Sequence, residues 1–122
     1  MGGRLVHWEL PAKDADRAQT FYEDLFGWSF QSWDGPMDYR MTRASGDPGG
    51  AIFPSQSGDV GPIVYFDTDD VDATVARIRE LGGQADDKAP IPGVGWFARA
   101  HDPEGNSISV FQADESAQMP NG

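Results

Sequence analysis

The run Leu5-Val6-His7-Trp8-Glu9-Leu10 leads through Asp14 into a helix-like stretch, and the run Ile63-Val64-Tyr65-Phe66 leads through Asp70 into a second one. The two aspartates are 56 positions apart (70 − 14), and the glycines that follow the two stretches have the same separation. Two copies of one supersecondary unit are therefore expected within this chain. We expect a ligand to bind in a cleft between the copies.

Each helix-like stretch has start and stop signals. Asp14 precedes a helix predicted over 15–26 and Gly27 follows it, while Asp70 precedes a helix predicted over 71–81. Aspartate is a good N-cap because its carboxylate accepts orphan amide protons, and glycine suits the left-handed residue after a helix. The apolar residues of the first helix, which include Phe21, Tyr22 and Phe26, are expected in the core.

Strand-like segments surround both helices, so each half reads β-α-β-β-β. The predicted strands cover 5–10, 28–33, 38–43, 50–53, 63–66, 84–87, 95–101 and 106–112. Their alternation places His7 and Tyr65 opposite Trp8 and Phe66, which we expect under the helices. The predicted fold is α+β, with two βαβββ modules forming a cupped mixed sheet in one domain. The first module covers 4–53, a linker 54–61, the second module 62–112 and a frayed polar tail 113–122.

Composition excludes several partners. The chain has 122 residues, with 9 Lys and Arg against 20 Asp and Glu, which gives a formal charge of −11. That charge disfavours nucleic acid and anionic membranes, because binding phosphate requires positive charge. The chain contains no cysteine, so disulfides and thiolate metal sites are absent. No segment reads as a membrane span or signal peptide, and we expect a cytoplasmic protein.

Two other motif matches fail on context. Residues 93–98 fit a G-x-G-x-x-G/A dinucleotide fingerprint, but they open a predicted strand where that motif must open a helix. The acidic run 67–72 resembles a calcium loop, yet it places Asp72 where the sharp turn needs glycine. Helix capping explains this acidic run better.

The chain resembles the glyoxalase/bleomycin-resistance/dioxygenase superfamily, whose members are also called vicinal oxygen chelate proteins. The resemblance extends from Leu5 to about Gln112 and rests on these stretches: His7-Trp8-Glu9-Leu10 with Asp14, Phe21-Tyr22, Phe26-Gly27-Trp28, Val71-Asp72-Ala73-Thr74, Leu81-Gly82-Gly83, Pro92-Gly93-Val94-Gly95-Trp96-Phe97 and Asp102-Pro103-Glu104-Gly105-Asn106. It implies paired βαβββ modules around a small-molecule cavity, commonly in homodimers. Some members are metal-dependent enzymes, and others sequester antibiotics.

The metal ligands that this resemblance implies are largely missing. The family's first-strand ligand falls on His7 and its repeat mate on Ile63, while the last-strand glutamate falls on Ser109. The fourth position lies near Phe53-Pro54, where no carboxylate stands. One ligand of four is too few for a metal that needs about three protein donors. We therefore predict no cofactor, although a divalent metal at an atypical site of His7, Glu9 and Asp67 stays an alternative.

The predicted ligand pocket combines polar and aromatic side chains. It contains His7, Glu9, Tyr65, Ser109, Tyr39, Trp96 and Phe111. Glu9 shares a strand face with His7, whereas His101 lies at a strand end and is expected on the surface. For Tyr39, Trp96 and Phe111 the core is the default environment, and an inward-facing set would favour a flat or apolar ligand.

Three functions follow from this pattern. The first is a small-molecule-binding homodimer without the usual metal site, which could sequester a ligand such as a cationic antibiotic. The second is a lyase, isomerase or dioxygenase with an atypical metal site, in which the metal polarises paired substrate oxygens. The third is a structural or regulatory dimerisation module. Catalytic residues are not assigned by the sequence.

Overall fold

The computed structural model describes residues 2–43, 46–55 and 61–118. These residues form two compact units, an N-terminal unit of residues 6–63 and a C-terminal unit of residues 64–118 together with residues 2–5. Linker positions 56–60 and the last four tail residues lie outside the described residues.

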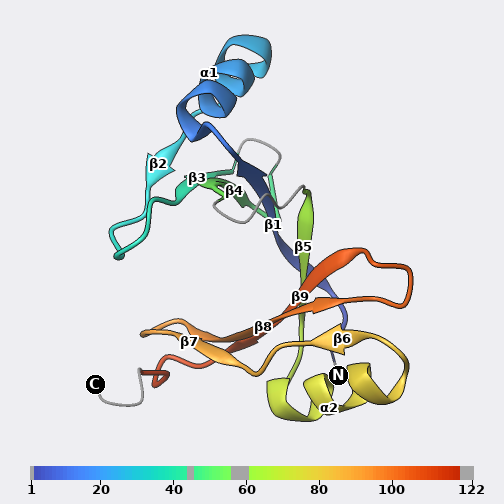
Figure 1. The fold of residues 1–122 in the computed structure, drawn as a ribbon. Coiled ribbons are helices and arrows are strands. Elements are labelled where there is room, and N and C mark those ends of the chain that lie inside the picture. Colours follow the sequence, from blue (N-terminus) through green and yellow to red (C-terminus); the bar gives the residue numbers. More distant parts are fainter. Residues whose placement is uncertain (1, 44–45, 56–60, 119–122) are drawn as a thin grey trace. The chain divides into compact units, whose positions relative to one another are not determined.

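In its described residues the N-terminal unit contains one helix and four strands, which are labelled in Figure 1. Its elements are β1 (Leu5–Ala12), α1 (Ala15–Phe26), β2 (Gln31–Ser32), β3 (Arg40–Thr42) and β4 (Gly50–Pro54). The strand order is β1-β4-β3-β2, with β1 and β4 parallel and the other neighbours antiparallel.

The C-terminal unit repeats this arrangement with one additional strand. Its elements are β5 (Ile63–Asp67), α2 (Val71–Glu80), β6 (Gln84–Ala85), β7 (Ala89–Ile91), β8 (Gly95–His101) and β9 (Ser107–Ala113). The strand order is β5-β9-β8-β6, with β5 and β9 parallel, and the additional strand β7 pairs with β8. Both units therefore have the same strand order and directions, which confirms the predicted α+β fold of two βαβββ modules. Strand β7 lies outside the strands predicted from the sequence.

The helices begin where the sequence predicted. Asp14 and Asp70 have extended backbones, and their carboxylates accept the amide protons of Arg17 at 3.0 Å and Ala73 at 3.1 Å. Gly27 ends α1 in the left-handed region at φ 72°. These contacts satisfy backbone groups that a helix end leaves without partners.

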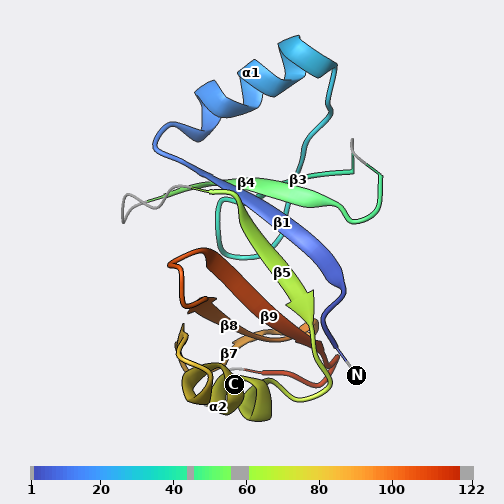
Figure 2. The same cartoon turned by 90° about the vertical axis from the view of Figure 1, so that its right-hand side faces the viewer.

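A small core holds α2 against its sheet. Val71 is 0% exposed and packs in a cluster with Val75 of the helix, Ala98 of β8 and Val110 of β9. Figure 2 shows α2 on one side of these strands. Because side chains alternate along a strand, the odd-numbered residues of β8 and β9 point away from the helix.

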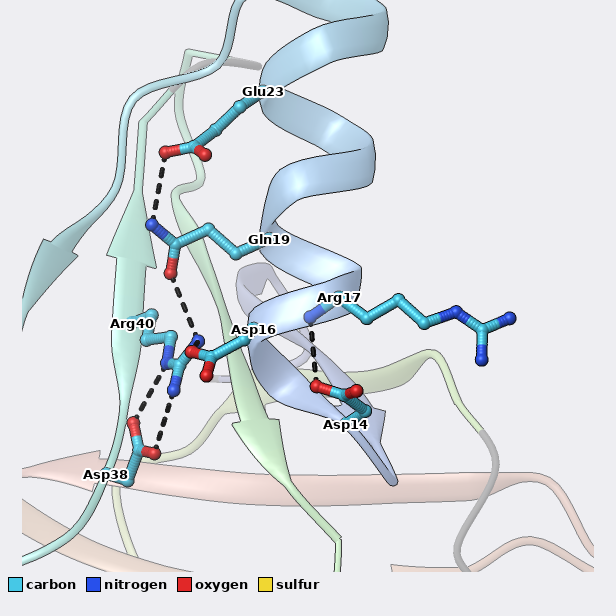
Figure 3. A network of polar contacts seen from close by, with 7 residues as sticks. All are labelled: Asp14, Asp16, Arg17, Gln19, Glu23, Asp38 and Arg40. Atoms are coloured by element: carbon cyan, nitrogen blue, oxygen red, sulfur yellow. Dashed lines mark hydrogen bonds and ion pairs between the residues drawn. The ribbon is translucent and has the colours of Figure 1, made fainter.

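Helix α1 packs differently, and our prediction that its aromatic residues are core is wrong for two of them. Phe21 is 57% exposed and Phe26 is 61% exposed, and Leu25 is 55% exposed. Polar contacts tie this helix to its sheet instead (Figure 3). Arg40 of β3 lies 2.7 Å from the carboxylate of Asp16 and donates to the Gln19 side chain at 3.3 Å.

The described part of the C-terminal segment is held by burial and hydrogen bonding of Ala117. Ala117 is 1% exposed, and its carbonyl accepts the amide proton of Gly93 at 3.0 Å. The predicted frayed tail is therefore wrong for residues 113–118, because β9 runs to Ala113 and a turn then docks Ala117. Neither helix in the described residues is long and apolar enough to cross a membrane.

Candidate functional site

The N-terminal unit has one face that lies away from its helix. Trp8 points to the helix side, where its ring centroid lies 5.9 Å from that of Trp28, which in turn stacks on Tyr22 of α1 at 5.1 Å. His7 and Glu9 flank Trp8 on β1 and therefore point to the other face. The predicted alternation is confirmed for this strand.

Tyr39 links His7 to Glu9 on that face. The Tyr39 hydroxyl donates to Glu9 Oε2 at 2.6 Å, and His7 Nε2 lies 2.5 Å from the same hydroxyl oxygen. A tyrosine has one hydroxyl proton, so when that proton is donated to Glu9 the hydroxyl oxygen accepts a hydrogen bond from the His7 tautomer that is protonated at Nε2. The three residues form one hydrogen-bond chain in which Glu9 is 3% exposed.

Burial controls the charge of His7. Removal of the ring from water lowers the pKa of His7 below its usual value, while the charge of Glu9 and a backbone hydrogen bond to Gly49 act in the opposite direction. Desolvation has the largest effect because it disfavours the charged imidazolium.

Aromatic rings surround the hydrogen-bond chain. The Tyr39 ring lies 6.3 Å from Phe53 in a stacked arrangement and 6.1 Å from Trp33 at an interplanar angle of 71°. Phe53 reaches this face because β4 pairs it with Pro11, two residues along β1 from Glu9. A few directional polar groups among aromatic walls are typical of small-molecule sites.

A second polar group lies on the helix-free face of the C-terminal unit. Ser109 of β9 pairs with Tyr65 of β5 on one side and with Arg99 of β8 on the other. Directly paired residues point to the same face of a sheet, so the three side chains form a row across three strands. The Arg99 guanidinium carbon lies 5.9 Å from the centroid of the Tyr65 ring.

The other predicted pocket residues divide between two faces. Phe111 follows Ser109 by two positions and pairs with Phe97, so it shares the helix-free face. Trp96 lies on the opposite face, where it packs against the core cluster beneath α2 and donates to Asp114 at 3.1 Å. The structure therefore brings Tyr65, Ser109 and Phe111 onto one face and separates Trp96 from them.

The residues at the family's metal positions do not fit a divalent ion. His7 Nε2 is engaged by Tyr39, Ile63 is apolar and 3% exposed, and Ser109 offers a hydroxyl beside a guanidinium. Within residues 2–43, 46–55 and 61–118, no group of three or more His, Cys, Asp or Glu side chains could hold a metal. Hydroxyl and guanidinium groups do not supply the anionic or imidazole donors that such ions require.

Asp67, the third member of the atypical metal site, has a structural contact. Its Oδ1 accepts the amide proton of Arg4 at 2.8 Å, and its backbone exchanges hydrogen bonds with Gly3 and Arg4. It lines a hollow of about 380 Å³ in the C-terminal unit, together with Phe66 and Thr68 among others. His101 is exposed at the end of β8, as predicted.

Arg99 is a residue that the sequence analysis missed. The turn Asp102-Pro103-Glu104-Gly105 is recognisable in the sequence, and the register of the two strands beside it pairs His101 with Ser107 and Arg99 with Ser109. Counting outward from that turn would have identified Arg99 as the neighbour of Ser109. The contact of Tyr39 with His7 spans 32 positions and had no comparable local signal.

Comparison with known proteins agrees with this architecture. Residues 4–41 match the family model described as bleomycin resistance protein-like N-terminal. A glyoxylase-like domain-containing protein of Didymella fabae is 33% identical over 119 residues, covering 88% of this chain and 92% of that protein. The chain belongs to the glyoxalase/bleomycin-resistance/dioxygenase superfamily.

Two further proteins are similar to this chain, one in sequence and one in fold. The putative glyoxylase CFP32 of Mycobacterium bovis is 36% identical over 115 residues, which cover 90% of this chain and 44% of that protein. The chain thus spans less than half the length of this curated relative. The crystal structure of methylmalonyl-CoA epimerase from Mycobacterium tuberculosis has a TM-score of 0.63 at 18% identity, covering 92% of this chain and 88% of that one, and shares the fold.

Proposed function

We propose that this superfamily member binds a small molecule on the helix-free faces of its units without a divalent metal. The observation that carries the proposal is the chain His7–Tyr39–Glu9. It engages the His7 nitrogen that faces Tyr39 in a short internal hydrogen bond, and the Tyr39 ring that holds this chain packs against the rings of Phe53 and Trp33.

Thermal melting with and without metal tests the metal-free part of this proposal. A ligand present at about 100 times its dissociation constant stabilises the native state by roughly 2.7 kcal/mol, so a true metal site would give a clear rise in melting temperature. We expect no saturable shift with nickel, zinc, manganese or ferrous iron. A stoichiometric metal-dependent shift that His7→Ala abolishes would favour the alternative, an enzyme with an atypical metal site.

Tyr39 provides the matched variant for this experiment. Tyr39→Phe removes the hydroxyl that occupies His7 and Glu9 but keeps the ring that stacks on Phe53. We expect this variant also to bind no metal, because two protein donors are fewer than a stable site needs. Metal binding by Tyr39→Phe alone would show that Tyr39 blocks a latent site.

A ligand screen tests the binding part. Compounds that bind the N-terminal unit should shift NMR signals of His7, Tyr39 and Phe53, and the shifts should weaken in Tyr39→Phe. Cationic antibiotics belong in the screen because sequestration of such a drug is one form of the proposal. Failure of every neutral, cationic and anionic compound to shift these signals or those of Tyr65 and Ser109 would contradict it.

The proposal includes a homodimer, supported by the exposed apolar surface of α1. Phe21, Leu25 and Phe26 are all more than half exposed, and a concentrated apolar surface is typical of an interface. Sedimentation velocity should give a dimer for the wild type and a monomer for Phe21→Glu. Asp24→Asn, on the same helix, serves as the control and should leave the mass unchanged.

A further inference from the structure

The outer face of α1, which is turned away from its sheet, carries apolar and charged side chains together. Because an α-helix turns by about 100° per residue, three side chains lie within about 60° of Phe21 around it, namely Arg17, Asp24 and Leu25. All four residues are exposed. Figure 3 shows Arg17 extending away from the side of the helix that carries Gln19, which bonds to β3. The outer face therefore presents an apolar surface with one charge of each sign.

The two charges on the outer face are not neutralised within the described part of the chain. Across residues 2–43, 46–55 and 61–118, neither Arg17 nor Asp24 forms an ion pair. By contrast, Asp16 on the sheet side of the same helix lies 2.7 Å from Arg40 of β3. A chain of net charge −11 repels a second copy of itself, so local pairs of opposite charge favour a dimer.

The outer face is complementary to itself under a twofold rotation. In an isologous dimer the same patch lies on both sides, so the patch must contain both members of each contact pair. When two α1 helices cross antiparallel at Phe21, Arg17 lies about 6 Å along the axis from the crossing point. The partner's Asp24 lies about 4.5 Å from that point in the same direction. The long arginine side chain spans the difference, and symmetry produces a second such pair beyond Phe21.

We propose that α1 pairs antiparallel with α1 of a second copy of this chain, with Phe21 of both copies at the crossing point and each Arg17 bound to the partner's Asp24. The inference rests on the homodimer of the proposed function and adds its orientation and its charged contacts. A second copy is the occupant that matches this face, because an unrelated protein would not require opposite charges at positions related by a twofold axis.

Charge reversal in the full chain tests the pairing by sedimentation equilibrium. Asp24→Arg and Arg17→Asp should each raise the dimer dissociation constant by more than about tenfold, because each places like charges opposite one another. The double variant Arg17→Asp/Asp24→Arg restores the pairs with their signs exchanged and should return the constant to within about threefold of wild type. Asp24→Asn should weaken the dimer less than about fivefold, since an exposed ion pair contributes little.

The design separates a specific contact from overall repulsion. Asp24→Arg makes the chain less negative and Arg17→Asp makes it more negative, so repulsion alone would shift the two constants in opposite directions. Arg77→Asp changes the net charge as Arg17→Asp does but lies on α2, and it should dimerise like that background. A monomeric wild type would overturn both the homodimer and this pairing. A dimer that Asp24→Arg does not weaken, or that the double variant does not restore, would overturn the pairing alone.

Cysteine cross-linking tests the antiparallel orientation, because the chain contains no cysteine of its own. An equimolar mixture of Arg17→Cys and Asp24→Cys should form a disulfide between the two variants under mild oxidation, since these positions lie about 1.5 Å apart along the axis. Neither variant alone should cross-link, because its own two cysteines lie about 9 to 12 Å apart along the axis, beyond the roughly 7 Å that a disulfide spans. A mixture that does not cross-link, or a single variant that cross-links as well as the mixture, would overturn the proposal.

Discussion

Helices α1 and α2 start from the same sequence signals but meet their sheets in different ways. Helix α2 buries Val71 and Val75 in an apolar cluster, whereas α1 buries only Ala15 and exposes Phe21 and Phe26. At the repeat distance of 56, Phe21 corresponds to Arg77 (77 − 21), a charged residue on the exposed side of α2. The repeated sequence pattern therefore determines where each helix begins and that it is capped. It does not determine whether the apolar side chains of that helix are buried or exposed.

The largest expected effect comes from replacing one side chain on each helix by alanine, a buried one on α2 and an exposed one on α1. Val71→Ala should lower the free energy of unfolding by about 2.5 kcal/mol, because it removes two buried methyl groups and leaves a cavity. Phe21→Ala should cost less than about 0.5 kcal/mol in the monomer, since the ring is 57% exposed. Urea melts at low protein concentration measure both. Equal losses would mean that α1 is as firmly packed as α2.

A second contrast lies within the N-terminal unit, between the His7–Tyr39–Glu9 hydrogen-bond chain and the aromatic stack beside α1. Tyr39→Phe should cost about 2 kcal/mol, because it removes a hydrogen bond to a carboxylate that is 3% exposed. Tyr22→Phe, within the aromatic stack of α1, is the matched control and should cost much less. If both changes have the same effect on denaturant melts, the His7–Tyr39–Glu9 chain contributes nothing to stability.

The sequence predicted local features of this fold well because their causes are local. The caps Asp14 and Asp70, the turns and the alternation of His7 with Trp8 each depend on a few neighbouring residues. The packing of α1 could not be predicted in this way. An apolar helix stripe indicates a buried face, but it does not say whether the chain's own sheet or another surface covers it.

The candidate site was predicted in part for the same reason. His7 and Glu9 follow from strand alternation, and Arg99 could have followed from the register of one hairpin. The bond from His7 to Tyr39 depends on how the residue before β3 approaches β1, which no local pattern encodes. Trp96 was placed with the pocket because its aromatic character alone does not show which face of β8 it occupies, and the pairing of β8 with β9 decides that.

Loss of the N-cap should lower the free energy of unfolding equally in the two repeats, although the two helices pack differently. Asp14→Ala and Asp70→Ala should each cost about 1 kcal/mol, because each removes the acceptor for one amide at a helix start. Asp69→Ala should cost clearly less than Asp70→Ala, since Asp69 is not the cap. Denaturant melts that gave Asp69 and Asp70 equal losses would show that the cap is wrongly assigned.

The smallest expected effect concerns the pH dependence contributed by His7. Burial lowers the pKa of this ring below its ordinary 6.5, so below that pH the unfolded chain takes up a proton that the folded chain resists. Its contribution to the free energy of unfolding is therefore fully present above pH 6.5 and declines as the pH falls toward the lower folded pKa. His7→Gln should remove this component and flatten the profile below pH 6.5, with a smaller effect than the substitutions above. His101→Gln, at the exposed end of β8, is the control, and a His7 ring signal that titrated above pH 6.5 in an NMR experiment would reverse the sign of the argument.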